Sequence, residues 1–180
     1  IVFLMNDPLA SYFTFRDVAA KAHERGLLVG CSTSAYFTEE SLADLVPFLD
    51  FVNIGVKGLS GGVYRECGGS TVVPVIRNMS LFHEAGVHVE VSCLFHRGKK
   101  GELRRLAEIM GGLSRDMPLQ IMRFLPLEGA DPGLEPTIAE AEALCLELTK
   151  TLNHVYLFNS PGSDFLDTRC PGCGTVIYRR

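Results

Sequence analysis

The sequence has no hydrophobic run that approaches the roughly 18 residues of a membrane span. A signal peptide is also missing, because the apolar start from Ile1 to Met5 lacks a basic flank and a cleavage site. Neither sign of charge is in large excess: the formal net charge is −4, which argues against general nucleic-acid binding. We therefore expect a cytoplasmic protein that binds neither membrane nor nucleic acid.

Regular cysteine spacing is absent as well. A secreted disulfide framework is therefore not expected, and reduced thiols or metal chemistry fit better. Only the final two cysteines are close together, in the run Cys170-Pro-Gly-Cys173. The six cysteines stand at positions 31, 67, 93, 145, 170 and 173.

What the sequence does contain is an alternation of short apolar runs and helical patterns. With 180 residues and 47% hydrophobic residues, the chain can form a sizeable core. The alternation predicts a parallel α/β sheet with right-handed crossovers, and a partial (β/α) TIM-like barrel is our first interpretation. A doubly wound sheet is the alternative. We expect strands at 2–5, 27–31, 51–56, 87–94, 119–124 and 154–158, with helices near 15–22, 72–85, 101–110 and 137–152 and a further helix that opens at Thr38-Glu-Glu-Ser41.

The run 51–56 is the central strand of this interpretation. It is apolar and β-branched, so we expect it to be buried on both faces. Gly55, Lys57 and Gly58 follow at its carboxyl end, where ligands bind in parallel α/β proteins. Helix ends are expected at Gly26, at Gly86 and at the pair Gly111-Gly112.

Two parts of the chain are predicted: a barrel portion, residues 1–160, and a tail, residues 161–180. Because the sequence begins inside an expected strand, we expect it to belong to a longer protein whose first barrel strand precedes Ile1. The edge left by that strand is expected to pair with another segment or chain.

The tail run Cys170-Pro-Gly-Cys173-Gly174 predicts a knuckle-like turn that points two thiolates at one metal, zinc or iron. A purely structural turn is an equal alternative. A dithiol redox pair is less favoured, because that motif opens a helix whereas 175–178 has the pattern of a strand.

One dense group of basic residues follows the fourth strand. It could line the mouth of a site and favour an acidic substrate or partner. A solvated helix start is the interpretation that we favour. The group consists of His96, Arg97, Lys99, Lys100, Arg104 and Arg105.

Four segments together resemble radical S-adenosylmethionine (SAM) enzymes. The resemblance is to the branch related to pyruvate formate-lyase activating enzymes, and within it to the AmmeMemoRadiSam-system radical SAM proteins. The tail is similar to the cysteine-containing tail of that group. The segments are Asp50-Phe-Val-Asn-Ile-Gly-Val-Lys-Gly58, Tyr64-Arg-Glu-Cys-Gly-Gly69, Pro74-Val-Ile-Arg-Asn78 and Leu81-Phe-His-Glu-Ala-Gly-Val87.

The resemblance implies roles for several strand-end residues. Asn6-Asp7-Pro8 falls where the family holds the amino group of SAM, and an aspartate can accept hydrogen bonds from that ammonium. Thr33, Ser34 and Tyr36 fall near the ribose and methionine of SAM, and Lys57 could pair with a carboxylate. The resemblance and the strand-end positions together give the expected cofactor-binding residues Asn6, Asp7, Thr33, Ser34, Lys57, Cys93 and Arg123. The tail turn gives Cys170 and Cys173 as the expected metal ligands.

One departure limits the interpretation. The family chemistry needs Cys-x-x-x-Cys-x-x-Cys to hold a [4Fe–4S] cluster, and this chain has no such triplet. The resemblance thus implies the SAM- and substrate-binding portion of a radical SAM enzyme whose cluster ligands lie outside this chain. The alternative is a cluster-less, non-catalytic α/β domain used for binding. The substrate, a small molecule or a protein, cannot be assigned from the sequence.

Overall fold

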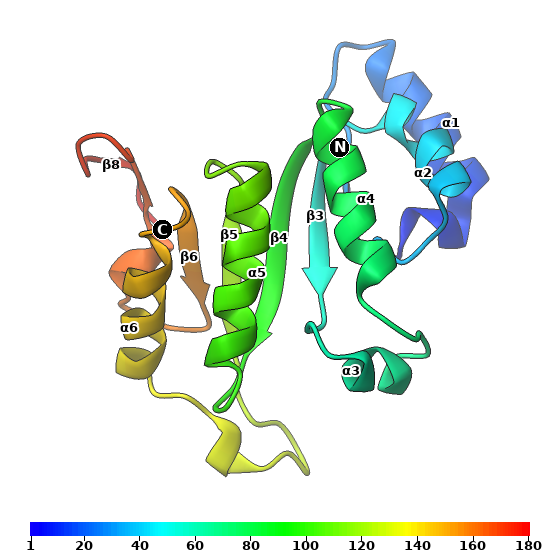
Figure 1. The fold of residues 1–180 in the computed structure, drawn as a ribbon. Coiled ribbons are helices and arrows are strands. Elements are labelled where there is room, and N and C mark those ends of the chain that lie inside the picture. The colour runs from blue at the N-terminus through cyan, green and yellow to red at the C-terminus, as the bar shows by residue number, and fades with distance from the viewer. The chain divides into compact units, whose positions relative to one another are not determined.

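A computed structural model describes residues 1–180, which form two compact units, Ile1–Val91 and Ser92–Arg180. Six parallel strands form one sheet in chain order, with helices between them (Figure 1). The sheet is not closed, because β1 and β6 each have only one neighbour. The strands are β1 Val2–Phe3, β2 Gly30–Thr33, β3 Phe51–Val56, β4 His88–Phe95, β5 Leu119–Arg123 and β6 Val155–Phe158.

Strand order decides between the two predicted architectures. A doubly wound sheet needs a point where the strand order reverses, whereas here each strand lies beside its predecessor. Right-handed crossovers that always advance in one direction place every connecting helix on the same face of the sheet. The predicted α/β fold, a partial barrel of parallel strands, is therefore confirmed.

The helices form where their sequences provide caps and apolar faces. In the first unit Thr38 begins α2 by accepting a hydrogen bond from the Ser41 amide, as the sequence predicted. In the second unit Thr137 and Glu140 form a reciprocal capping box at the start of α6. The helices are α1 Tyr12–His23, α2 Glu39–Leu45, α3 Gly61–Glu66, α4 Val73–Glu84, α5 Lys100–Leu113 and α6 Ile138–Leu148, with short 3₁₀ turns at Pro8–Ser11, Val46–Phe48, Pro132–Leu134 and Asp164–Leu166.

The expectation that residues 51–56 are buried on both faces is wrong. In β3 the side chains of Val52, Ile54 and Val56 are buried, whereas Phe51 and Asn53 are only half-buried. A sheet with all its helices on one face covers only the alternate residues that point toward them. The other face of each strand is left for polar or partly exposed side chains.

The expected helix stop at Gly111-Gly112 is also wrong, because α5 continues through both glycines to Leu113. A Cβ atom on Gly111 would lie 2.9 Å from Cγ2 of Thr151. Gly111 therefore permits a close approach between α5 and the turn before β6, which is a packing role rather than a terminating one. The helix Gly61–Glu66, with two glycines at its start, was not predicted.

The tail contains a small sheet of its own. Strand β7, Thr168–Arg169, pairs antiparallel with β8, Val176–Tyr178, and the cysteine run forms the loop between them. The guanidinium of Arg180 lies over the rings of Tyr156 and Phe158 on β6, at 5.4 and 5.7 Å from their centroids. None of the helices has the length and apolar character needed to cross a membrane.

Candidate ligand-binding site

Asp7 is the centre of the contacts at the carboxyl ends of β1 and β2. Its Oδ2 accepts hydrogen bonds from the Thr33 hydroxyl at 2.7 Å, the Ser34 amide at 3.1 Å and the Ser34 hydroxyl at 3.2 Å. Its Oδ1 accepts only the Leu9 amide, at 3.3 Å. The structure therefore brings together three of the residues expected at the site, Asp7, Thr33 and Ser34.

These contacts leave the carboxylate with remaining acceptor capacity on one oxygen. A carboxylate oxygen can accept two hydrogen bonds, so Oδ1 can accept a further donor beside the Leu9 amide. Asp7 is half-buried, so that donor must come from solvent or from a ligand. The remaining acceptor position on Oδ1 thus fits an ammonium donor such as the one on the methionine part of SAM.

The loop after β2 is held in a strained conformation. Ala35 has φ of +50°, a region that residues with a Cβ atom rarely adopt. Its amide donates to the Thr33 hydroxyl at 3.0 Å, and its carbonyl accepts from Nδ2 of Asn78 at 2.9 Å. Asn78 is fully buried on α4 and also donates to the Phe37 carbonyl at 2.8 Å. These contacts offset the local strain and fix the position of Thr33 and Ser34.

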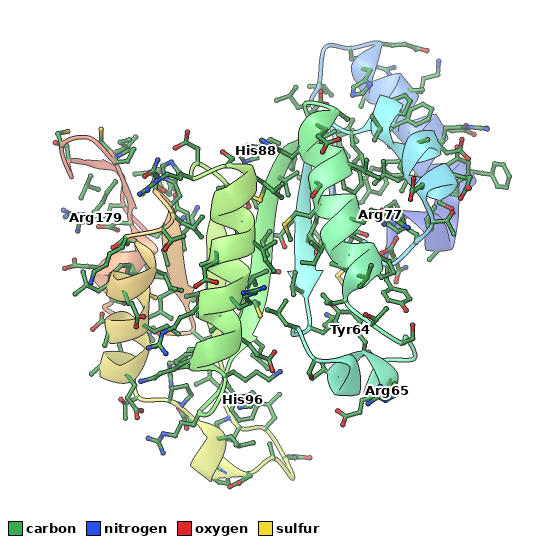
Figure 2. The ribbon with its side chains drawn as sticks, viewed as in Figure 1. Tyr64, Arg65, Arg77, His88, His96 and Arg179 are labelled. Carbon is green, nitrogen blue, oxygen red and sulfur yellow. The ribbon has the colours of Figure 1, made fainter.

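Asn78 was not assigned to the site from the sequence. The available signal was an amide side chain at position 78, within the helical apolar spacing of Val75, Met79 and Phe82. A buried amide must find partners, so a polar residue on such a face indicates a structural or functional contact. Its neighbour Arg77, labelled in Figure 2, donates from Nη2 to the same Phe37 carbonyl at 2.8 Å.

Tyr36 connects the loop after β2 with the segment between α3 and α4. Its hydroxyl contacts the Ser70 hydroxyl at 3.2 Å and accepts the Ser70 amide at 2.9 Å. These bonds, first the hydroxyl and then the amide, lower the pKa of Tyr36. Its ring stacks on Tyr64 of α3, with 5.8 Å between centroids, and packs so closely on Gly69 that a Cβ there would lie 2.9 Å from Cζ (Figure 2 labels Tyr64).

Lys57 and Asn6 complete the candidate site in the first unit. Lys57 comes directly after β3, is exposed, and makes no ion pair with any side chain of the chain. Asn6 is exposed beside Asp7. Because β1, β2 and β3 pair in parallel, Asp7, Ser34 and Lys57 lie at the same end of these strands. A carboxylate and a free ammonium at one sheet end can bind a zwitterionic ligand.

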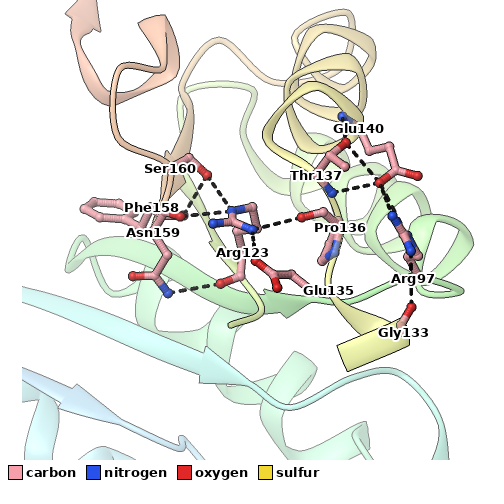
Figure 3. A network of polar contacts seen from close by, with 10 residues as sticks. All are labelled: Arg97, Arg123, Gly133, Glu135, Pro136, Thr137, Glu140, Phe158, Asn159 and Ser160. Carbon is pink, nitrogen blue, oxygen red and sulfur yellow. Dashed lines mark hydrogen bonds and ion pairs between the residues drawn. The ribbon is translucent and has the colours of Figure 1, made fainter. Parts of the chain in front are cut away.

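Arg123 occupies the corresponding place in the second unit, at the end of β5, and is only 7% exposed. Its Nη1 donates to Oε1 of Glu135 at 2.7 Å and to the Pro136 carbonyl at 2.9 Å (Figure 3). Its Nε donates to the Asn159 carbonyl at 2.9 Å and to the Ser160 hydroxyl at 3.2 Å. The guanidinium therefore connects the loop before α6 with the end of β6.

Cys93, the remaining expected residue, lies on β4 in the second unit. It is 6% exposed and alternates in register with the buried Val91 and Phe95. Its side chain thus belongs to the helix-covered face of the sheet rather than to the strand ends.

The basic group after β4 is largely neutralised by acidic neighbours. Arg97 contacts Glu140 at 3.1 Å, and Arg104 contacts Glu147 at 2.6 Å. The Thr137 amide, followed by Arg97, lowers the pKa of Glu140 to about 2. Arg105 pairs with Glu108 within α5 at 3.8 Å, and Lys99, which directly precedes this helix, lies 3.9 Å from Glu102.

His96 (Figure 2) begins the same loop, and its Nδ1 contacts the Arg97 carbonyl at 2.7 Å. Because a carbonyl can only accept, Nδ1 is the donor in this contact.

The residues present do not fit a [4Fe–4S] cluster. Burial raises the pKa of the Cys31 and Cys145 thiols to about 12, which disfavours the thiolate form that binds iron. Across residues 1–180, no group of three or more histidine, cysteine or acidic side chains is placed to hold a metal ion. Any cluster would need ligands from outside these residues.

Comparison with known proteins finds one relative in sequence and several solved structures with a similar fold. No protein-family model matches the sequence. An uncharacterized protein of Methanocaldococcus jannaschii, MJ0808, is 29% identical over 187 residues, which cover 100% of this chain and 55% of that protein. The chain thus spans about half the length of this relative.

Three solved structures share the fold at low sequence identity. A domain of a pyruvate-formate lyase-activating enzyme from Bacteroides vulgatus matches with a TM-score of 0.72 at 14% identity, over 87% of this chain and 97% of the domain. Streptococcus suis SuiB bound to S-adenosylmethionine matches with a TM-score of 0.66 at 13% identity, over 87% and 38% of the two chains. The third, anSMEcpe with bound AdoMet, has a TM-score of 0.57 at 14% identity, over 83% and 45%. At these identities the likeness shows a common fold, and the fold agrees with the resemblance drawn from the sequence.

Proposed function

We propose that this chain is the SAM- and substrate-binding portion of a radical SAM protein of the branch related to pyruvate formate-lyase activating enzymes. The observation that carries the proposal is the match in fold to a domain of such an enzyme, of which 97% is covered. Two further matched structures, those of SuiB and anSMEcpe, are complexes with SAM. In the complete protein the reaction class is reductive cleavage of SAM to a 5′-deoxyadenosyl radical.

Within this proposal, each strand-end residue has a definite task. Asp7 accepts the SAM ammonium through Oδ1, while Thr33 and Ser34 hold the other oxygen and so fix the carboxylate plane. Lys57 pairs with a carboxylate of SAM or of the substrate. Arg123 has bonds from Nε and Nη1 to protein acceptors, so it shapes the loop before α6 and offers Nη2 to a ligand.

Equilibrium binding of SAM to the purified chain tests the proposal. We expect measurable binding that Asp7→Ala weakens by about tenfold or more, the effect of one lost charge-assisted hydrogen bond. Ser34→Ala keeps the carboxylate and removes only one of its supports, so its effect should be smaller. Asp44→Ala, an exposed aspartate on α2, is the matched control and should bind as the parent chain does. Absence of SAM binding, or equal loss in the control, would contradict the proposal.

The chain has no Cys-x-x-x-Cys-x-x-Cys and no group of three side chains placed to hold a metal. This favours a second candidate function, a cluster-less α/β domain that binds a ligand without catalysis. An experiment on the full-length protein, after anaerobic addition of iron and sulfide, distinguishes the two candidate functions. Production of 5′-deoxyadenosine from SAM supports the enzyme, whereas SAM binding without this product supports the binding domain. From these 180 residues alone we expect no such product, because the cysteine triplet is missing.

A further inference from the structure

The loop between β7 and β8 holds two cysteines at a tight turn. The Cys170 amide donates to the Thr175 carbonyl at 2.9 Å, and the Gly174 amide donates to the Cys170 carbonyl at 2.8 Å. Gly174 has φ of +72°, a conformation that glycine adopts without strain. The two backbone bonds close the turn around Cys170 and Cys173, so the hairpin presets the backbone from which both thiols project.

Both sulfur atoms lie at the tip of this hairpin. A Cβ placed on Gly172 would be 3.9 Å from Sγ of Cys170, so this sulfur lies over the turn itself. Sγ of Cys173 lies 3.2 Å from the Thr175 hydroxyl. Cys173 is exposed and Cys170 is half-buried, so both can be reached from solvent.

From this geometry we propose that the β7–β8 hairpin is a half-site for a soft divalent metal ion. Zinc is the metal that it would bind naturally, and Cys170 and Cys173 are its two thiolate ligands. Thiolates are the ligands that select zinc over magnesium or calcium. Each thiol loses its proton when it binds, so one metal ion displaces two protons from the pair. The half-site uses none of the residues of the candidate SAM site, and it does not depend on the proposed function.

Metal binding accounts for the hairpin better than dithiol redox chemistry does. A Cys-x-x-Cys redox pair is activated at a helix N-terminus, whereas residues after Cys173 form the strand Val176–Tyr178. A closed structural zinc site needs four ligands, and residues 1–180 place no third histidine, cysteine or acidic side chain at the hairpin. In this chain solvent therefore takes the remaining coordination positions of the metal.

Titration of the fully reduced chain with Co²⁺, a spectroscopic substitute for zinc, tests the proposal. We expect a thiolate-to-cobalt charge-transfer band that saturates at one ion per chain, is displaced by Zn²⁺, and releases two protons per ion. Cys170→Ser and Cys173→Ser should each lose the band. Cys67→Ser, which removes an exposed cysteine outside the hairpin, is the matched control and should keep it.

Three outcomes would overturn the half-site. These are no charge-transfer band in the reduced chain, a band that survives both serine variants, and a band that Cys67→Ser abolishes. Far-UV circular dichroism of each variant verifies that the fold is retained. Because both hairpin cysteines lie at an exposed turn, we expect unchanged spectra and unchanged unfolding midpoints in the metal-free state.

Discussion

The two units stabilise their strand-end loops with charges of opposite sign and different burial. In the first unit the half-buried carboxylate of Asp7 accepts hydrogen bonds and keeps capacity on one oxygen. In the second unit the buried guanidinium of Arg123 donates to two carbonyls, a hydroxyl and a carboxylate. The difference indicates that the first unit leaves a group for a ligand, whereas the second uses its charge mainly to hold its own loops.

The largest stability effect is expected from Arg123→Met. This change leaves the Glu135 carboxylate and the Pro136 and Asn159 carbonyls without their donor. Breaking a buried ion pair from one side is strongly destabilising, and partial exposure of Glu135 reduces the effect, so we expect a loss of about 3 kcal/mol. Urea unfolding measures it. Arg123→Lys is the comparison: it keeps the charge but not the planar fork, and should recover only part of the stability.

Asn78→Ala comes next and tests the first unit. The substitution removes the donors to the Ala35 and Phe37 carbonyls and leaves a small cavity in α4, which should destabilise the protein by about 2 kcal/mol. Exposed Asn153→Ala is a matched amide control. A loss in Asn78→Ala no greater than in this control would show that the loop 33–37 does not need the buried amide.

Asp7→Asn should have a smaller effect on stability than on ligand binding. The amide retains an oxygen that can accept from Thr33 or Ser34, so we expect a stability loss of about 1 kcal/mol. The substitution also removes the negative charge that would pair with the SAM ammonium. SAM binding should therefore weaken more than the stability of the protein does. Thermal unfolding and equilibrium binding on the same preparations compare the two. If the free energy of unfolding and the free energy of SAM binding fall by the same fraction, Asp7 is a purely structural residue.

The smallest expected effect is a pH dependence from Asp50 at the opposite end of β3. The Val29 amide, and then His23 at 2.9 Å, lower the pKa of Asp50. A carboxyl group whose folded pKa lies below its unfolded value adds stability above the unfolded pKa, and this stability is lost as pH falls through the folded pKa. Asp50→Asn should therefore flatten the acidic limb of a plot of unfolding free energy against pH. The contribution is small because the side chain is 35% exposed. An unchanged acidic limb would contradict this assignment.

Much of the fold was predictable because it depends on local patterns. All six strands were located within a few residues, since each is a short apolar run that ends in a turn. The cap at Thr38 was predicted because it needs only a hydroxyl placed before a helix. The choice of the barrel over the doubly wound sheet was left open, because strand order is not encoded in periodicity.

The contacts of the candidate site were less accessible to sequence reasoning. Asp7, Thr33 and Ser34 could be proposed together because turns that follow parallel strands meet at one end of a sheet. Asn78 could not, because its partners Ala35 and Phe37 lie about 40 residues away in the chain. The packing role of Gly111 could not be predicted either, because it depends on a close approach to Thr151, which lies far away in the sequence.

The sequence by itself determined the alternation of strands and helices, the polar turns at the strand ends, and the turn that carries Cys170 and Cys173, because each depends on neighbouring residues. Only the tertiary structure decided which face of the sheet is covered, which carboxylate oxygen remains available, and that Arg123 is used by its own loops. Those properties follow from contacts between distant segments, where burial forces every polar group to find a partner.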